Sequence, residues 1–233
     1  MSNFCIKRIQ EDIMVIKKNR LDKDNIFVDV DEENLKKIRV MIIGPEKTPY
    51  ENGYYFFEFN YTNNYPYEPP IVKFINPNIN VRFHPNFYKK GKICLSILNT
   101  WHGPGWTASQ NTSNILTTIL SIMHKYPIQN EPGWENETGI KSQNYNNVIA
   151  YHNIADSIIK NIENIPFDFR IFQEICNKKF LKNKDKIKVF CNNYKKLEGE
   201  IVKSGIYMMT ILDYDIYNLI DKIELLIAKL NKN

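Results

Sequence analysis

The 233-residue sequence lacks several features that define large classes of proteins. No apolar run reaches the ~18–20 residues that a membrane-spanning helix needs. Charges every few residues in MSNFCIKRIQEDIMVIKK argue against a secretory signal. Among only nine glycines there is neither a G-x-x-x-x-G-K nor a G-x-G-x-x-G phosphate loop. We therefore expect a protein of the cytoplasm or nucleus that has no membrane partner and does not itself bind ATP.

Cysteine is scarce and widely spaced. The four cysteines, Cys5, Cys94, Cys176 and Cys191, never form a C-x-x-C pair. Neither a disulfide framework nor a zinc cluster is expected, so we predict no metal and no cofactor. The net charge of +5 is small and spread along the chain, which gives no reason to expect a nucleic-acid partner.

What is present is an α+β pattern followed by helices. Residues 3–19 predict an amphipathic helix whose apolar stripe is Ile6, Ile9, Ile13 and Ile16. Four β-prone runs with short connections predict an antiparallel four-stranded meander, at 26–30, 35–43, 54–61 and 71–75. A long irregular segment, 76–111, leads to helices at 112–125 and near 142–163.

Pro166 predicts a break, because proline disfavours helix at the preceding residue. Beyond it, 167–233 carries apolar stripes that predict an all-helical extension, whose last helix runs from about residue 207 to 230. We therefore expect two parts, a core of residues 1–165 and an extension of residues 166–233, in line with usual domain sizes.

Cys94 is the one candidate nucleophile in the irregular segment. Taken alone, it fits a small buried hydrophobic residue better than a catalytic thiol. A cysteine hydrolase would also need a histidine beside the sulfur. His84 and His102 are near in sequence, but no local pattern pairs either one with Cys94.

The neighbouring motifs resemble the ubiquitin-conjugating enzymes, the second enzymes of the ubiquitin cascade. His84-Pro85-Asn86 precedes Cys94-Leu95 at the spacing of that family's signature. IKRI, TPYENG and YPYEPPIVKF occur upstream in the family's order. The resemblance spans most of residues 1–163 and implies the ubiquitin-conjugating fold. The W-x-G-P-x-W form of 101–106 resembles a larger subclass that carries C-terminal helices.

The resemblance implies a role for each residue of the active-site segment. Cys94 would carry the modifier as a thioester, and Asn86 would stabilise the oxyanion or brace the loop, a contribution of ~10²–10³ in rate. Glu131 would orient or deprotonate the lysine amine, although an exposed loop carboxylate is the alternative. The structural residues of this loop would be His84, Pro85, Leu95, Trp101 and Trp106.

The resemblance also implies surfaces for partners. Lys7 and Arg8 would engage the activating enzyme, although a solvated helix face is the simpler reading. Tyr67 and the Thr107-Ala108 pair would contact a ubiquitin ligase, with Thr-Ala standing where the family usually has Ser-Pro. We therefore expect an enzyme that accepts ubiquitin or a ubiquitin-like protein on Cys94 and passes it to substrate lysines. The alternative is a non-catalytic ubiquitin-binding or scaffold module with the same fold.

Overall fold

The computed structural model describes residues 2–232, which divide into two compact units. The first contains the chain up to Ile42, Tyr55–Asn76 and Asn86–Ile122, and the second contains Ile43–Tyr54, Pro77–Pro85 and the chain from Met123 onward. Neither unit is one continuous segment. The predicted boundary at 165/166 concerns where a conjugating core ends, and it stays a prediction. Within the described range, no helix has the length and apolar character needed to cross a membrane.

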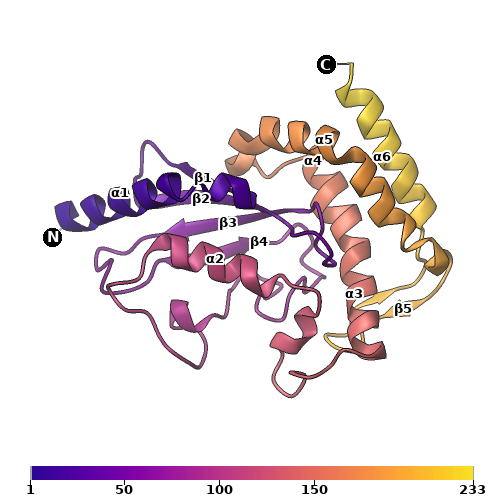
Figure 1. Cartoon of the computed structure of the whole chain (residues 1–233), viewed down its shortest axis with the longest axis horizontal. Helices are drawn as coiled ribbons and strands as arrows, with labels where there is room; N and C mark the ends of the chain where they lie inside the picture. Colours follow the sequence, from indigo (N-terminus) through magenta and orange to yellow (C-terminus); the bar gives the residue numbers. More distant parts are fainter. Residues whose placement is uncertain (1, 233) are drawn as a thin grey trace. The chain divides into compact units, whose positions relative to one another are not determined.

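The predicted meander is confirmed. β1 (Ile26–Val30), β2 (Lys37–Ile43), β3 (Tyr54–Asn60) and β4 (Ile71–Ile75) form one sheet in that order (Figure 1). β1 and β2 pair antiparallel, as do β3 and β4, where Phe57 lies opposite Phe74. β2 begins two residues later than predicted, because the amide of Lys37 closes a turn onto the carbonyl of Asn34 at 2.8 Å.

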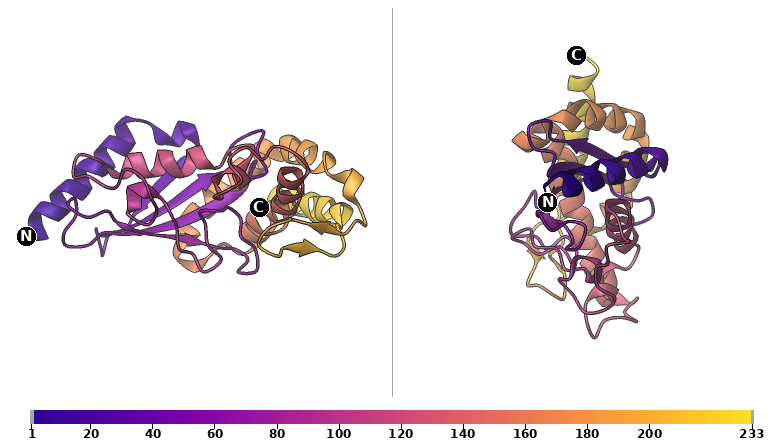
Figure 2. Two further views of the ribbon diagram at one scale, coloured as in Figure 1. Left: turned by 90° about the horizontal axis from the view of Figure 1, so that it is seen from below. Right: turned by 90° about the vertical axis from the view of Figure 1, so that its left-hand side faces the viewer.

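The helix α1 (Ser2–Lys18) forms as predicted, but its buried face is rotated. Ile6 and Ile13 of the predicted stripe are only half-buried. The residues that are buried lie three or four apart along the helix, namely Cys5, Ile9, Asp12 and Ile16. α1 packs beside α2 (Thr112–Ile122), and Figure 2 shows the two helices next to each other.

A charged residue, Asp12, lies at the centre of this helix pair and is only 2% exposed. Its carboxylate accepts hydrogen bonds from Arg8 Nε at 2.9 Å and from the amide and hydroxyl of Thr112 at 2.8 Å each. The Tyr65 hydroxyl donates to the same carboxylate. The negative charge thereby satisfies a first-turn amide of α2, a position that the helix dipole also favours.

The second unit is largely helical. α3 (Ile140–His152) continues through a π-helical stretch, Asn153–Lys160, into the short α4 (Asn161–Glu163), which together account for the helix predicted near 142–163. α5 (Gln173–Asn192) and α6 (Ile216–Leu230) lie side by side (Figure 1). Their apolar stripes supply fully buried side chains, including Phe180, Ile187 and Ile223.

The predicted C-terminal helices are present, but the expectation of helix throughout 167–233 is wrong for one stretch. β5 (Val202–Lys203) and β6 (Thr210–Ile211) form a two-stranded antiparallel ribbon between α5 and α6 (Figure 2). Gly199 and Gly205, with φ of 73° and 78°, lie before and after β5 in a backbone conformation that glycine adopts without strain. α6 begins at Ile216 rather than near residue 207, because Asp215 caps it by accepting from the Asn218 amide at 3.2 Å.

Replacing Asp12 tests how much this buried carboxylate stabilises the fold. Asp12→Ala removes the shared acceptor and leaves Arg8, Tyr65 and Thr112 with unmatched donors, so we expect the free energy of unfolding to fall by about 3–5 kcal/mol. Urea denaturation followed by circular dichroism measures this loss. Asp22→Ala, which breaks an exposed pair with Arg20, serves as the matched control and should leave the urea midpoint unchanged.

Candidate active site

The spacing between Asn86 and Cys94 is the product of a small hairpin. Phe87 and Ile93 form an antiparallel bridge, the amide of Tyr88 donates to Lys92 O at 2.9 Å, and Gly91 closes the turn. In this register Asn86 lies directly opposite Cys94. The Cys94 amide donates to the Asn86 carbonyl at 3.0 Å, and Asn86 Nδ2 donates to the Cys94 carbonyl at 2.6 Å. Both polar groups of the Cys94 backbone are therefore held by Asn86.

The tip of this hairpin is joined to the sheet at Gly91. The amide of Phe74 in β4 donates to Gly91 O at 2.8 Å. Gly91 has φ of 90°, and a Cβ on it would lie 2.6 Å from Phe74 O, so only glycine fits here. The rings of Phe57, Phe74 and Phe87 pack at centroid distances of 5.2–5.6 Å and bury the inner side of the hairpin.

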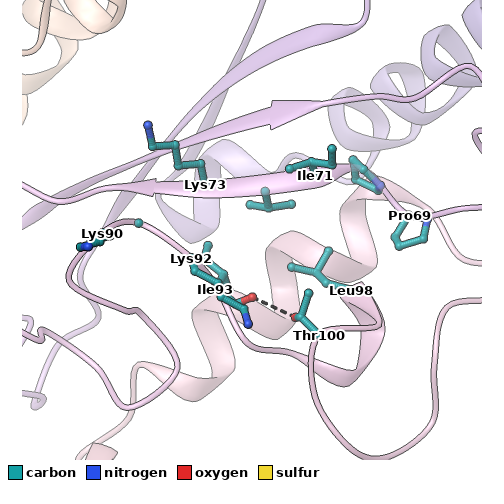
Figure 3. A pocket seen from close by; sticks show the side chains of 11 residues that line it. Pro69, Ile71, Lys73, Lys90, Lys92, Ile93, Leu98 and Thr100 are labelled. Atoms are coloured by element: carbon teal, nitrogen blue, oxygen red, sulfur yellow. Dashed lines mark hydrogen bonds between the residues drawn. The ribbon is translucent and has the colours of Figure 1, made fainter.

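Thr100, which belongs to none of the sequence motifs, braces the backbone on both sides of Cys94. Its hydroxyl donates to Ile93 O at 2.8 Å, a bond drawn in Figure 3, and accepts from the Leu95 amide at 2.9 Å. These two residues flank Cys94. A cavity of about 390 Å³ lies between β4 and this segment, with Thr100 on its wall. Figure 3 shows the side chains that line it. A threonine six residues after a candidate nucleophile gives no local signal of such a role.

Asn99 holds the long segment that leads to Trp106. Its side-chain oxygen accepts from the Trp106 amide at 2.8 Å, and the Trp106 ring N–H donates to Pro66 O at 2.7 Å. Trp106 and Leu95 are buried, whereas Trp101 is 42% exposed. Trp106 and Leu95 therefore lie in the interior, and the Trp101 ring is open to solvent; the structural roles predicted for these residues stay predictions.

Burial affects the thiols of three of the four cysteines. All four are free thiols. Burial raises the pKa of Cys5, and it raises the pKa of Cys176 and Cys191 to about 12. Because the thiolate is the nucleophile, these three thiols are poor candidates for chemistry at neutral pH. Cys94, held by the hairpin, is the remaining candidate.

Three further residues of the predicted site belong to the second unit. His84 is fully buried, with its ring centroid 6.1 Å from that of Tyr50, and Pro85 O accepts from Arg82 Nη2 at 2.5 Å. Glu131 follows a short 3-10 turn, Pro127–Asn130, and is half-buried. Its carboxylate accepts a hydrogen bond from the Tyr207 hydroxyl. The roles predicted for these residues stay predictions.

Arg8 has an internal role that the sequence did not indicate. Besides binding Asp12, its guanidinium donates to the carbonyls of Ala108 at 2.8 Å and Gln110 at 2.5 Å. It thereby ties α1 to the loop predicted to contact a ligase. Lys7, by contrast, is exposed. The predicted contact of both residues with an activating enzyme stays a prediction.

The surface predicted to contact a ligase, Tyr67 with Thr107-Ala108, includes an exposed pair of aromatic rings. Tyr67 is 74% exposed, and its ring stacks on that of Phe4, 55% exposed, at a centroid distance of 6.3 Å. Thr107 is exposed and Ala108 half-buried. Phe4 is a surface residue that the helical pattern alone did not mark.

Comparisons with known proteins agree with these motifs. The model of the ubiquitin-conjugating enzyme family matches residues 8–158. Ubiquitin-conjugating enzyme E2 Z of Xenopus tropicalis is 38% identical over 201 residues, covering 85% of this chain and 64% of that protein. The human dual E2 ubiquitin-conjugating enzyme/E3 ubiquitin-protein ligase BIRC6 is 36% identical over 178 residues, covering 73% of this chain and 4% of that protein.

The crystal structure of a ubiquitin conjugating enzyme E2 from Plasmodium falciparum is 30% identical, covers 50% of this chain and 96% of that one, and has a TM-score of 0.44. Since the family model matches more than half of the residues, this chain belongs to the ubiquitin-conjugating enzyme family. The match covers 64% of the Xenopus relative's length, which is less than two thirds, and it reaches beyond residue 165 of this chain.

Thr100→Val tests whether the threonine hydroxyl holds the Cys94 segment. The change keeps the shape but leaves Ile93 O and Leu95 N–H unpaired, so we expect a loss of about 1–3 kcal/mol in unfolding free energy. Faster amide hydrogen exchange should be confined to residues 93–95. Thr118→Val removes a hydroxyl bond to Asn114 O on the solvent side of α2 and is the control. Unchanged exchange at 93–95 would contradict the bracing role.

Proposed function

We propose that this chain accepts ubiquitin or a ubiquitin-like protein from an activating enzyme as a thioester on Cys94 and transfers it to substrate lysines. The observation that carries the proposal is the hairpin that sets Cys94 opposite Asn86, within the region that matches the family model. The alternative is a non-catalytic binding module with the same fold, and the presence of both Cys94 and the His84-Pro85-Asn86 turn favours the enzyme.

The first step is thioester exchange. The Cys94 thiolate attacks the carbonyl carbon of the modifier's C-terminal thioester on the activating enzyme, a new C–S bond forms, and the activating enzyme's thiol is released. Sulfur suits this reaction because a thiolate is both a good nucleophile and a good leaving group. Cys94 is only 3% exposed, so little space is open around its sulfur. A modifier whose C-terminus is a narrow, extended tail fits this space best.

The second step is aminolysis. A lysine nitrogen attacks the thioester carbonyl, the C–N bond forms, the C–S bond breaks, and Cys94 leaves as thiolate while the amine loses a proton. We assign Asn86 to the oxyanion that develops on the carbonyl oxygen. A primary amide has two N–H donors, so bracing the Cys94 carbonyl and stabilising an oxyanion are compatible. Glu131 is the carboxylate that we assign to the attacking amine, whose ordinary pKa of about 10.4 must be overcome.

Partners are assigned to two exposed surfaces. We assign Lys7 to the activating enzyme, because Arg8 is already bound to Asp12 and the 108–110 carbonyls. The Phe4–Tyr67 pair and Thr107-Ala108 are the surface we assign to a ubiquitin ligase, since exposed stacked aromatic rings are typical interface anchors.

We further infer that the protein works in the cytoplasm or nucleus. Thioester chemistry needs a free thiol, and reducing compartments keep thiols free. The four free cysteines support this assignment.

Loading with ubiquitin tests the first step. The protein, incubated with an activating enzyme, ATP and ubiquitin, should give an adduct that reductant removes on a gel. Cys94→Ala should abolish the adduct, and Cys94→Ser should give one that resists thiol reductant because an oxyester replaces the thioester. Cys191→Ala is the matched control and should still load. If no activating enzyme and no ubiquitin-like protein gives an adduct, the catalytic proposal is wrong.

Asn86→Ala separates the two steps. We expect loading to persist, while discharge of the thioester to free lysine slows by roughly 10²–10³-fold, the usual loss for one oxyanion donor. Single-turnover discharge of purified thioester measures the second step alone. Asn146→Ala, which removes a comparable amide-to-carbonyl bond to Lys125, is the control. Equal losses in both steps would instead assign Asn86 a purely structural role.

A further inference from the structure

The turn of the β5–β6 ribbon has an unusual backbone. Between the strands, the Ser204 amide donates to Met209 O at 3.0 Å, and the Ser204 hydroxyl donates to Ile206 O. Tyr207 and Met208 have φ of 59° and 54°, in the left-handed region that side chains other than glycine rarely adopt. Two such residues in succession persist only where surrounding contacts hold them.

The contacts that hold this turn converge on Tyr207. The Arg82 guanidinium carbon lies 4.4 Å from the centre of its ring, and the Tyr145 ring meets it edge-on at 6.1 Å. The Arg82 amide donates to Met209 Sδ at 3.2 Å, and the Tyr145 hydroxyl donates to Arg82 O at 3.0 Å. Met208, next in the chain, is fully exposed. The strained turn therefore turns Tyr207 inward, while its neighbour points into solvent.

The hydroxyl of this inward-turned ring donates to the Glu131 carboxylate. The backbone of Glu131 is already held, because its amide donates to Ile128 O and its carbonyl accepts from Trp134, both at 3.0 Å. Asn130 next to it donates to Pro127 O at 3.1 Å. The side chain is the part of Glu131 that these backbone bonds leave undetermined, and Tyr207 orients it.

We propose that Tyr207, from the C-terminal segment, is a positioning residue that orients the Glu131 carboxylate for lysine discharge. The proposal rests on the proposed function, because it assumes that Glu131 acts on the attacking amine. A carboxylate has two oxygens with several acceptor sites, so a bond from Tyr207 to one oxygen still allows it to accept from an amine. Tyr207 keeps its proton throughout, and the proton lost by the amine goes to the carboxylate.

This arrangement gives the C-terminal segment a part in the chemistry. A glutamate side chain has three rotatable bonds, and fixing its carboxylate in advance removes an entropic penalty from the step that uses it. Tyr207→Phe removes only the hydroxyl and keeps the ring against Arg82 and Tyr145. Tyr214→Phe is the matched control, because it removes a hydroxyl bond of 3.0 Å to Asn147 O from the same segment.

The test measures discharge of the Cys94 thioester over a series of free-lysine concentrations for wild type, Tyr207→Phe, Glu131→Gln, the double variant and the control. We expect normal loading in all of them. Tyr207→Phe should lower the saturating discharge rate about tenfold, leaving the lysine concentration at half-maximal rate unchanged. The double variant should be no slower than Glu131→Gln alone, because Tyr207 acts through Glu131.

Other outcomes overturn the proposal and are separable from failure of the proposed function. If Tyr207→Phe discharges its thioester at the wild-type rate, Tyr207 has no role through Glu131. The same conclusion follows if the double variant is slower than Glu131→Gln by the factor that Tyr207→Phe alone causes. Normal discharge by Glu131→Gln would refute the proposal too, while the conjugating function stands. If the protein never loads, both fall. Independently of activity, Tyr207→Phe should speed amide exchange in residues 128–134; unchanged exchange there would mean that Tyr207 does not hold the loop.

Discussion

The buried carboxylate of Asp12 is the constraint on which the first compact unit depends. Removing a carboxylate from water is unfavourable unless donors replace the lost hydration, and here Arg8, Tyr65 and Thr112 supply them. These donors come from α1, from the loop after β3 and from the first turn of α2. A single acceptor thus fixes the mutual placement of three segments that are far apart in the sequence.

The same principle, that buried backbone groups must find partners, shapes the candidate active site. An irregular segment has no helix or sheet ladder to satisfy its amides and carbonyls. The 86–94 hairpin solves this locally, and Asn86 and Thr100 complete it around Cys94. The amide and the carbonyl of Cys94 are consequently both hydrogen-bonded, although Cys94 lies outside the sheet. The spacing of eight positions between Asn86 and Cys94 is the length of a hairpin whose turn is closed by Gly91.

The C-terminal segment is more than an appended bundle. Its helices α5 and α6 supply part of the second unit's core, and the ribbon between them brings Tyr207 to Glu131. A left-handed turn at two residues other than glycine is unfavourable by itself, so the stacking of Arg82 and the hydroxyl bond compensate for it. The loop that carries Glu131 is thereby held by a residue of the C-terminal segment.

Much of the architecture could be predicted from the sequence alone. Short aromatic and β-branched runs determined the four strands, glycine and proline marked the irregular segment, and ordered motifs pointed to the family and to Cys94 and Asn86. These signals are local, because a strand or a turn is set by residues within a few positions of one another.

Only the tertiary structure decided the rest. The rotated face of α1, the internal role of Arg8, the bracing by Thr100 and the bond from Tyr207 to Glu131 join residues that no local pattern relates. The two-residue strands β5 and β6 are too short to produce a periodic signal. The long-range contacts arise because a buried polar group needs a hydrogen-bond partner, which can be far away in the sequence. Asp12, for example, accepts from Thr112, 100 residues away.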